Sequence, residues 1–126
     1  MTDKTCLFCR IAPALLIAEN ELACVIRDAF PVVELHSLII SKRHVADFFG
    51  LDAQEREACH ALLEATRRSI LAKDATVEGF NVGINSGEAA GQTIYHSHIH
   101  LIPRRRGDVR NPRGGVRHVI LGKGFY

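Results

Sequence analysis

The stretch TIYHSHIHLIP, from Thr93 to Pro103, carries a histidine at every second position. Side chains two residues apart on a β-strand share one face, so a strand here would present His96, His98 and His100 together. The apolar residues between them would face the opposite side, which is typical of a core face. This segment therefore predicts a strand near the C-terminus with one face in the core and the other face carrying the histidines.

Three interpretations of the alternating histidines remain open on spacing alone. They can lie on a polar sheet face without chemistry, converge on one metal ion, or supply a nucleophile and its neighbours. A catalytic metal site usually adds a carboxylate or a further histidine, but the next acidic residue is Asp108, beyond a run of arginines. A neutral imidazole is a good nucleophile near pH 7, because its ordinary pKa is about 6.5.

The loop before this strand, NSGEAAGQT, favours phosphate chemistry. Asn85, Ser86, Gln92 and Thr93 supply hydrogen-bond donors. Glycines at positions 87 and 91 allow backbone amides to approach an anion closely. Glycine-rich loops are common, so the loop gains weight only from its place beside the histidines.

One long helix between two groups of strands is expected. Asp52 followed by Glu55 resembles a capping box, and the helix should run to about Lys73. Its buried stripe is predicted to be Cys59, Leu62, Leu63, Thr66 and Ile70, and its outer face Glu55, Arg56, Glu64, Arg67 and Arg68. The expected strands are LLIAE, LACVIR, HSLIIS, GFNVGINS and TIYHSHIHLIP. This order predicts an α+β fold with a mostly antiparallel sheet of about five strands and a short N-terminal helix.

The length of 126 residues suits a single domain over 1–126, with residues 104–126 as an arginine-rich extension of it. The polar N-terminus predicts no signal peptide, and no apolar run approaches the roughly 20 residues of a membrane span. We therefore expect a cytoplasmic protein with no membrane partner. A net charge of +2 is too weak to argue for nucleic acid. The six arginines between Arg104 and Arg117 suit either a phosphate site or a solvated tail.

Cys6 and Cys9 have the spacing of half a tetrahedral zinc site. A redox Cys-x-x-Cys motif normally follows a strand, and only five residues precede Cys6. Two reduced cysteines in an N-terminal turn are the remaining alternative. Cys24 and Cys59 fall on apolar segments and are expected to be buried thiols.

Nearly the whole chain resembles the histidine triad (HIT) superfamily of nucleotide hydrolases and transferases. The segments that carry the resemblance are CLFCRI, VIRDAFP, HSLIISKRHV, NVGINSG and GQTIYHSHIHLIPR. The chain departs from the family pattern at Ser97, which is usually apolar, and at Ser41, where a proline is common. The sequence VVELH also replaces the usual proline-glycine-histidine approach.

The resemblance implies that His98 attacks the α-phosphate of a purine nucleotide and forms a covalent nucleotidyl-histidine. Water then releases a nucleoside monophosphate, and His100 and His36 flank the phosphate. The implied substrate contacts are Asp28, Asn85, Gln92 and Thr93. Asp28 would bind the ribose hydroxyls, although a turn residue before Pro31 is the plainer interpretation. The substrates would be dinucleoside polyphosphates or nucleoside phosphoramidates.

The resemblance also implies a structural Zn²⁺ held by Cys6, Cys9, His44 and His96, no organic cofactor, and a homodimer. The C-terminal segment, including His118, is a candidate contact to the second site of that dimer. Two other functions compete with hydrolysis. One is a nucleotide-binding module with incidental turnover. The other is processing of adenylated nucleic-acid ends, but HIT-like proteins with that activity usually carry an extra DNA-binding module, for which this short chain lacks room.

Overall fold

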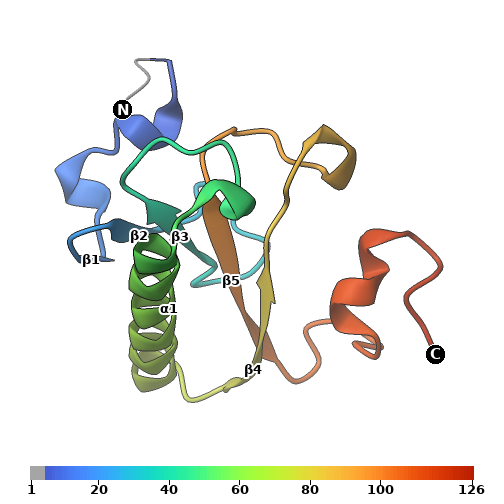
Figure 1. The fold of residues 1–126 in the computed structure, drawn as a ribbon. Coiled ribbons are helices and arrows are strands. Elements are labelled where there is room, and N and C mark those ends of the chain that lie inside the picture. Colours follow the sequence, from blue (N-terminus) through green and yellow to red (C-terminus); the bar gives the residue numbers. More distant parts are fainter. Residues whose placement is uncertain (1–4) are drawn as a thin grey trace.

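The computed structural model describes residues 5–126 and contains one five-stranded antiparallel sheet with one long helix (Figure 1). The strands are β1 (Ala18–Glu19), β2 (Ala23–Arg27), β3 (Ser37–Ser41), β4 (Val77–Gly83) and β5 (His98–Arg105), in the spatial order β1-β2-β3-β5-β4. The helix α1 spans Ala53–Lys73 and packs over β2 and β3, and the C-terminal segment lies beside β4. The predicted α+β class is confirmed.

Several predicted boundaries differ from the structure. The short N-terminal helix is a pair of 3₁₀ turns, Leu7–Cys9 and Pro13–Leu15, and the strand expected at LLIAE is only the two residues of β1. Residues 1–4, part of the stretch used to predict that there is no signal peptide, lie outside the described residues. No helix within residues 5–126 is long and apolar enough to cross a membrane.

Helix α1 begins where its sequence predicted. The Asp52 carboxylate accepts a hydrogen bond from the Glu55 backbone N–H (2.8 Å), and the Glu55 carboxylate accepts one from the Asp52 N–H (2.9 Å). This capping box satisfies two donors that the first helical turn cannot pair by itself. The predicted stripe is confirmed, because Cys59, Leu62, Thr66 and Ile70 are buried and Leu63 packs against them.

Glu55 itself corrects the prediction that it lies on the outer face of α1. The side chain is only 3% exposed and forms a two-pronged ion pair with Arg43, at 2.7 and 2.8 Å. Hydrogen bonding to the Arg43 guanidinium holds the pKa of Glu55 below its usual value. The helix start is thereby tied to the loop that follows β3.

The sheet is buried on both faces over β2 and β3, so these strands are continuous apolar runs rather than alternating ones. One face packs against α1 through residues that include Val25, Ile39 and Leu101. The opposite face, with Cys24, Ile26, Leu38 and Ile40, is covered by Phe8, Ile11 and Leu16 of the N-terminal segment. Cys24 and Cys59 are buried free thiols, as predicted.

The histidine strand starts later than expected. We predicted a strand over 93–103, but β5 begins at His98, which leaves His96 outside it. The Ser97 N–H donates to the Val45 carbonyl (2.7 Å), and the Ser97 carbonyl accepts from the Ser41 N–H (3.3 Å). His96 is fully buried in this irregular segment, so the three histidines do not share one sheet face.

Candidate active site and metal centre

A cavity of about 280 Å³ lies between the N-terminal turn, the ends of β2 and β5, and the loop before β5. Its polar side consists of Asp28, Asn85, Gln92, Thr93, His98 and His100. Its apolar side consists of Leu7, Phe8, Ile26, Ala29, Phe30 and Leu38. The structure thus brings six predicted site residues to one hollow, while His36 lies against His100 and is buried.

His98 is held in one orientation, with a proton on Nδ1. Its Nδ1 lies 2.7 Å from the carbonyl oxygen of His96, and a carbonyl can only accept a hydrogen bond. The Nδ1–H therefore donates, and in the neutral ring the Nε2 keeps its lone pair. The Phe8 ring meets the imidazole edge-on, with centroids 5.0 Å apart. An imidazole fixed in this way can act as a nucleophile.

His36, His100 and Asp28 form a compact group beside His98. The Nε2 of His36 lies 2.9 Å from the Nδ1 of His100 and 3.4 Å from a carboxylate oxygen of Asp28. Burial lowers the pKa of both imidazoles, with Asp28 opposing the shift. The other Asp28 oxygen accepts from the Phe30 N–H (2.8 Å), so Asp28 serves the turn and faces the histidines at once.

Gln92 is a brace between backbone segments. It is 4% exposed, accepts from the Gly87 N–H (2.8 Å) and donates to the carbonyls of Ala46 (2.6 Å) and Ile94 (3.1 Å). By contrast, the side chains of Asn85 and Thr93 make no hydrogen bond within residues 5–126. These two side chains therefore have polar groups that are available to a ligand in the cavity, as are the Nε2 atoms of His98 and His100.

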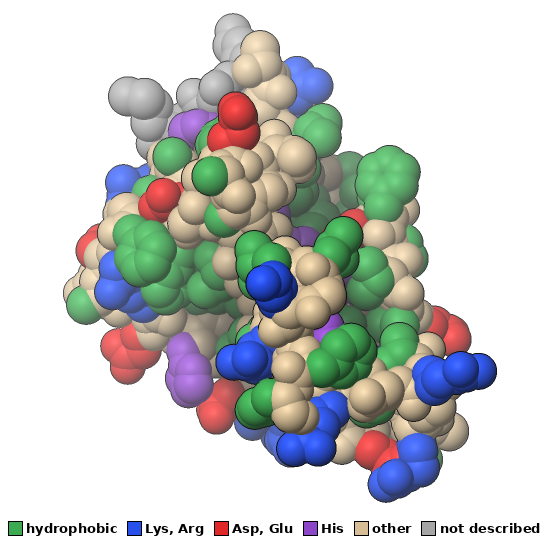
Figure 2. All heavy atoms as spheres, turned by 90° about the vertical axis from the view of Figure 1, so that its right-hand side faces the viewer, with side chains coloured by type: hydrophobic (Ala, Val, Ile, Leu, Met, Phe, Trp, Pro, Cys, Tyr) green, Lys and Arg blue, Asp and Glu red, His purple; other side chains and the backbone are tan. Residues whose placement is uncertain are grey.

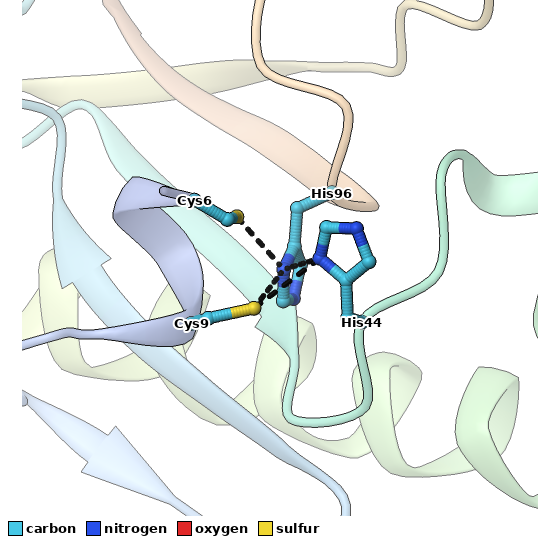
Figure 3. Close-up of side chains that lie close together, drawn as sticks. All are labelled: Cys6, Cys9, His44 and His96. Atoms are coloured by element: carbon cyan, nitrogen blue, oxygen red, sulfur yellow. Dashed lines mark hydrogen bonds between the residues drawn. The ribbon is translucent and has the colours of Figure 1, made fainter. Parts of the chain in front are cut away.

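The residues predicted to bind zinc converge from three segments. Figure 3 shows Cys6 and Cys9 on the N-terminal turn, with His44 and His96 pointing toward them. The Cys9 sulfur lies 3.2 Å from the Nδ1 of His44 and 3.5 Å from that of His96, the Cys6 sulfur lies 3.4 Å from the Nδ1 of His96, and the two Nδ1 atoms are 3.2 Å apart. A tetrahedral Zn²⁺ with ordinary bond lengths separates such ligands by about 3.3 to 3.6 Å. The four donors therefore fit the ion.

The proton state of His96 also suits a metal ligand. Its Nε2 lies 2.6 Å from the Ser41 carbonyl, so the Nε2–H donates there and the Nδ1 keeps its lone pair. Carbonyl acceptors of this kind commonly orient histidines that bind metals.

Two features of the site were missed by sequence reasoning. Phe8, between the two cysteines, contacts His98, and this contact cannot be predicted without the fold. Leu35, directly before His36, has a left-handed backbone with φ of 72°. The signal for the latter was present, since a glycine usually stands in the VVELH approach and tolerates that conformation.

The arginine-rich extension does not reach the cavity. Arg104 pairs with Asp108 (2.8 Å), Arg105 with Asp74 (2.9 Å) and Arg106 with Glu78 (3.3 Å). A larger hollow of about 470 Å³ lies beside these arginines but contains no histidine. Figure 2 looks onto this face, where the basic side chains gather on the lower part with hydrophobic groups between them. The smaller cavity is therefore the candidate active site.

The C-terminal segment folds on itself. The His118 Nε2–H donates to the Arg113 carbonyl (2.8 Å), and the His118 ring packs against Phe125 at 4.3 Å. The predicted contact between His118 and a partner's site stays a prediction.

Comparison with known families decides the identity. The model of the HIT domain matches residues 10–107, which include β1 to β5, α1 and the cavity residues from Ile26 to His100. The chain belongs to the HIT family. Its superfamily consists of nucleotide-binding hydrolases and transferases.

Named relatives agree with this assignment. The HIT protein is 36% identical to an uncharacterized HIT-like protein of Mycoplasma genitalium over 82% of this chain and 75% of that one. It is 35% identical to an adenylylsulfatase of Arabidopsis thaliana, over 84% of this chain and 55% of the plant protein. A zinc-bound histidine triad protein of Mycobacterium smegmatis superposes with a TM-score of 0.75 at 35% identity, covering 82% and 78% of the two chains.

Proposed function

We propose that this HIT protein hydrolyses purine nucleotides at the α-phosphate through a covalent intermediate on His98. The observation that carries this proposal is the hydrogen bond from His98 Nδ1–H to the His96 carbonyl, which leaves the Nε2 lone pair available. Further support comes from the cavity, whose apolar wall suits a base and whose unused polar groups, on Asn85 and Thr93, suit phosphate or ribose.

The proposed reaction has two steps. The His98 Nε2 lone pair attacks the α-phosphorus, an N–P bond forms, and the bond to the leaving group breaks. The leaving group departs with that electron pair and takes up a proton. Water then attacks the same phosphorus, a P–O bond forms, and the N–P electron pair returns to His98 as the water proton is released. Splitting one displacement into two lowers each barrier.

We also propose that Cys6, Cys9, His44 and His96 hold a structural Zn²⁺. Support comes from the ligand spacing and from the zinc-bound relative of Mycobacterium smegmatis. Four protein ligands leave no open position for water, so the ion would supply folding energy and no chemistry. No organic cofactor enters the proposed reaction.

The test is a substrate panel with trapping of the intermediate. Purified protein is incubated with diadenosine tetraphosphate, adenosine phosphoramidate and adenylyl sulfate, then quenched within one turnover and weighed by intact mass spectrometry. We expect an added nucleotidyl mass on His98 with at least one substrate. His98→Ala should lower turnover by a factor on the order of 10⁴. His60→Ala, an exposed histidine on α1, is the matched control and should keep full activity.

Two results would redirect the proposal. Full turnover in His98→Ala would exclude His98 as the nucleophile. Tight nucleotide binding without any nucleotidyl-protein would support a binding module with incidental turnover instead.

We propose that the chain forms a homodimer through β4. This strand is an edge of the sheet, with no strand beside its outer side within residues 5–126, and Val82 on it is 45% exposed. An exposed edge readily pairs with another strand. Light scattering should give the dimer mass for the parent protein and the monomer mass for Val82→Asp; a monomeric parent would contradict the proposal.

A further inference from the structure

The backbone of Val32 hydrogen-bonds to a histidine of the candidate active site. The Val32 N–H donates to the Nδ1 of His36 at 3.2 Å. An amide N–H can only donate, so the Nδ1 must be an unprotonated acceptor. A ring that kept a proton on Nδ1, either as the other neutral form or as the imidazolium, would place two donors against each other. The single ring proton of His36 therefore resides on Nε2.

The proton position of His100 is set by its hydrogen bond with His36. The His36 Nε2–H lies 2.9 Å from the Nδ1 of His100, which must accept it. A carboxylate oxygen of Asp28 is more distant from the same Nε2, at 3.4 Å. With its Nδ1 occupied as an acceptor, neutral His100 carries its proton on Nε2. The lowered pKa values of the buried His36 and the half-buried His100 agree with this neutral state.

Several hydrogen bonds fix the turn that directs the Val32 N–H toward His36. The His36 carbonyl accepts from the Asp28 N–H (2.9 Å), and the His36 N–H donates to the Val33 carbonyl (3.2 Å). The Leu35 carbonyl accepts from the Ser37 hydroxyl (2.8 Å). The Val32 amide therefore belongs to a turn whose C-terminal end, at Leu35 and His36, is held by hydrogen bonds to Asp28, Val33 and Ser37.

We propose that the backbone N–H of Val32 is a positioning group that fixes the proton of His36, and through it the proton of His100, on Nε2. His98 is fixed in the opposite form, with its proton on Nδ1. Two adjacent imidazoles, with centroids 5.3 Å apart, thus offer a lone pair and a donor to the same cavity. The proton positions follow from the hydrogen bonds and do not depend on the proposed function. Only the use of the His100 donor on a phosphate or leaving group rests on that function.

The same proton distinguishes this group from the metal centre. Ligand atoms of Asp28, His36 and His100 lie within 4.8 Å of one another, a spacing that a cation can bridge. A cation there would need the lone pair of His36 Nε2, and moving that proton to Nδ1 would oppose the Val32 N–H. At the zinc site the hydrogen bond to Ser41 has the reverse effect and frees the coordinating nitrogen. Only the zinc site should therefore retain metal, so protein loaded with Zn²⁺ and then desalted should contain one zinc ion per chain.

The direct test is the histidine tautomers of the zinc-loaded wild-type protein. Long-range ¹H–¹⁵N NMR on ¹⁵N-histidine protein at pH 7.5 identifies which ring nitrogen is protonated, with signals assigned from His36→Gln and His100→Gln. We expect the proton on Nε2 in His36 and His100 and on Nδ1 in His98. A proton on Nδ1 of His36 overturns the inference, and this measurement requires no altered turn.

Val32→Pro and Val32→Ala separate the amide from the side chain. Proline removes the N–H, so both Nδ1–H and Nε2–H forms of His36 and His100 should appear, whereas alanine should retain the wild-type spectrum. On a substrate that turns over, kcat should fall about tenfold or more in Val32→Pro, since a positioned proton donor contributes roughly 10²–10⁴. A folded Val32→Pro with wild-type tautomers overturns the inference. Expected tautomers in a protein that hydrolyses nothing would instead leave the inference standing and refute the proposed function.

Discussion

At Leu35 the chain uses a residue that its backbone conformation disfavours. A left-handed conformation costs a residue with a Cβ about 1–2 kcal/mol relative to glycine, and Leu35 partly offsets this cost because its side chain packs against the core. The conformation is retained because the turn before His36 requires it.

We expect Leu35→Gly to be more stable than Leu35→Ala by about 1 kcal/mol, the reverse of the usual order of these residues. Both variants lose the leucine packing, so their difference isolates the backbone strain. Urea unfolding of the two zinc-loaded variants measures it. A less stable glycine variant would show that residue 35 is not strained.

Gln92 and Asn85 line the same cavity but should respond differently to alanine. Gln92→Ala leaves three backbone groups without partners and should lower the free energy of unfolding by about 2 kcal/mol or more. Asn85→Ala should leave stability within about 0.5 kcal/mol and weaken adenosine monophosphate binding. Thermal unfolding and calorimetric titration on both variants check this; equal stability of the two would argue against the brace.

On the scale of elements, Glu55 joins the start of α1 to the loop after β3. Its pKa is lowered in the folded protein, chiefly by hydrogen bonding to Arg43. A lowered carboxyl pKa stabilises the fold above the unfolded value of about 4.5, and this contribution is lost as pH falls through the folded value.

The wild type should therefore be more stable than Glu55→Gln at pH 7, with the gap closing as pH falls below about 4.5. Comparing the two proteins in the same buffers removes effects of metal release that both share. Urea unfolding from pH 7 to pH 3.5 measures the gap. A gap that stays constant across this range would mean that the Arg43 pair does not act through charge.

The elements that the sequence predicted well are those set by neighbouring residues. Helix α1 was predictable because both partners of its capping box are three residues apart and its stripe is periodic. The start of β5 was not, because the hydrogen bonds of Ser97 go to Val45 and Ser41. The burial of Glu55 likewise depends on its ion pair with Arg43, which lies outside the helix, so the helical periodicity could not predict it. The division of the triad between two sites was implied by the family resemblance, whereas the spacing of the three histidines alone left it open.

On the scale of the whole molecule, the metal centre and the cavity share the N-terminal segment. Cys6 and Cys9 flank Leu7 and Phe8, which line the cavity. Holding the two cysteines therefore holds the apolar wall, while His98 is held by the backbone carbonyl of His96 and not by a side chain that faces the metal.

Removing the metal should consequently weaken nucleotide binding more than the chemical step. We expect chelation to lower Tm by roughly 5–10 °C and to raise KM with little change in kcat. Added Zn²⁺ should reverse both effects, and a Cys9→Ser variant should resemble the chelated protein without responding to Zn²⁺. Unchanged KM and Tm after metal removal, verified by elemental analysis, would contradict this coupling.

His96 contributes to both sites with different parts of itself: its side chain faces the metal ligands, and its carbonyl accepts the proton of His98. Every amino acid has that carbonyl, whereas only a few have a side chain that binds zinc. In evolution, the contribution of the His96 side chain can therefore be lost without losing the contribution of its carbonyl. A lineage can exchange the four side chains of the proposed metal centre and still pass on the proton acceptor of His98, the proposed nucleophile, because no substitution at position 96 removes a backbone carbonyl.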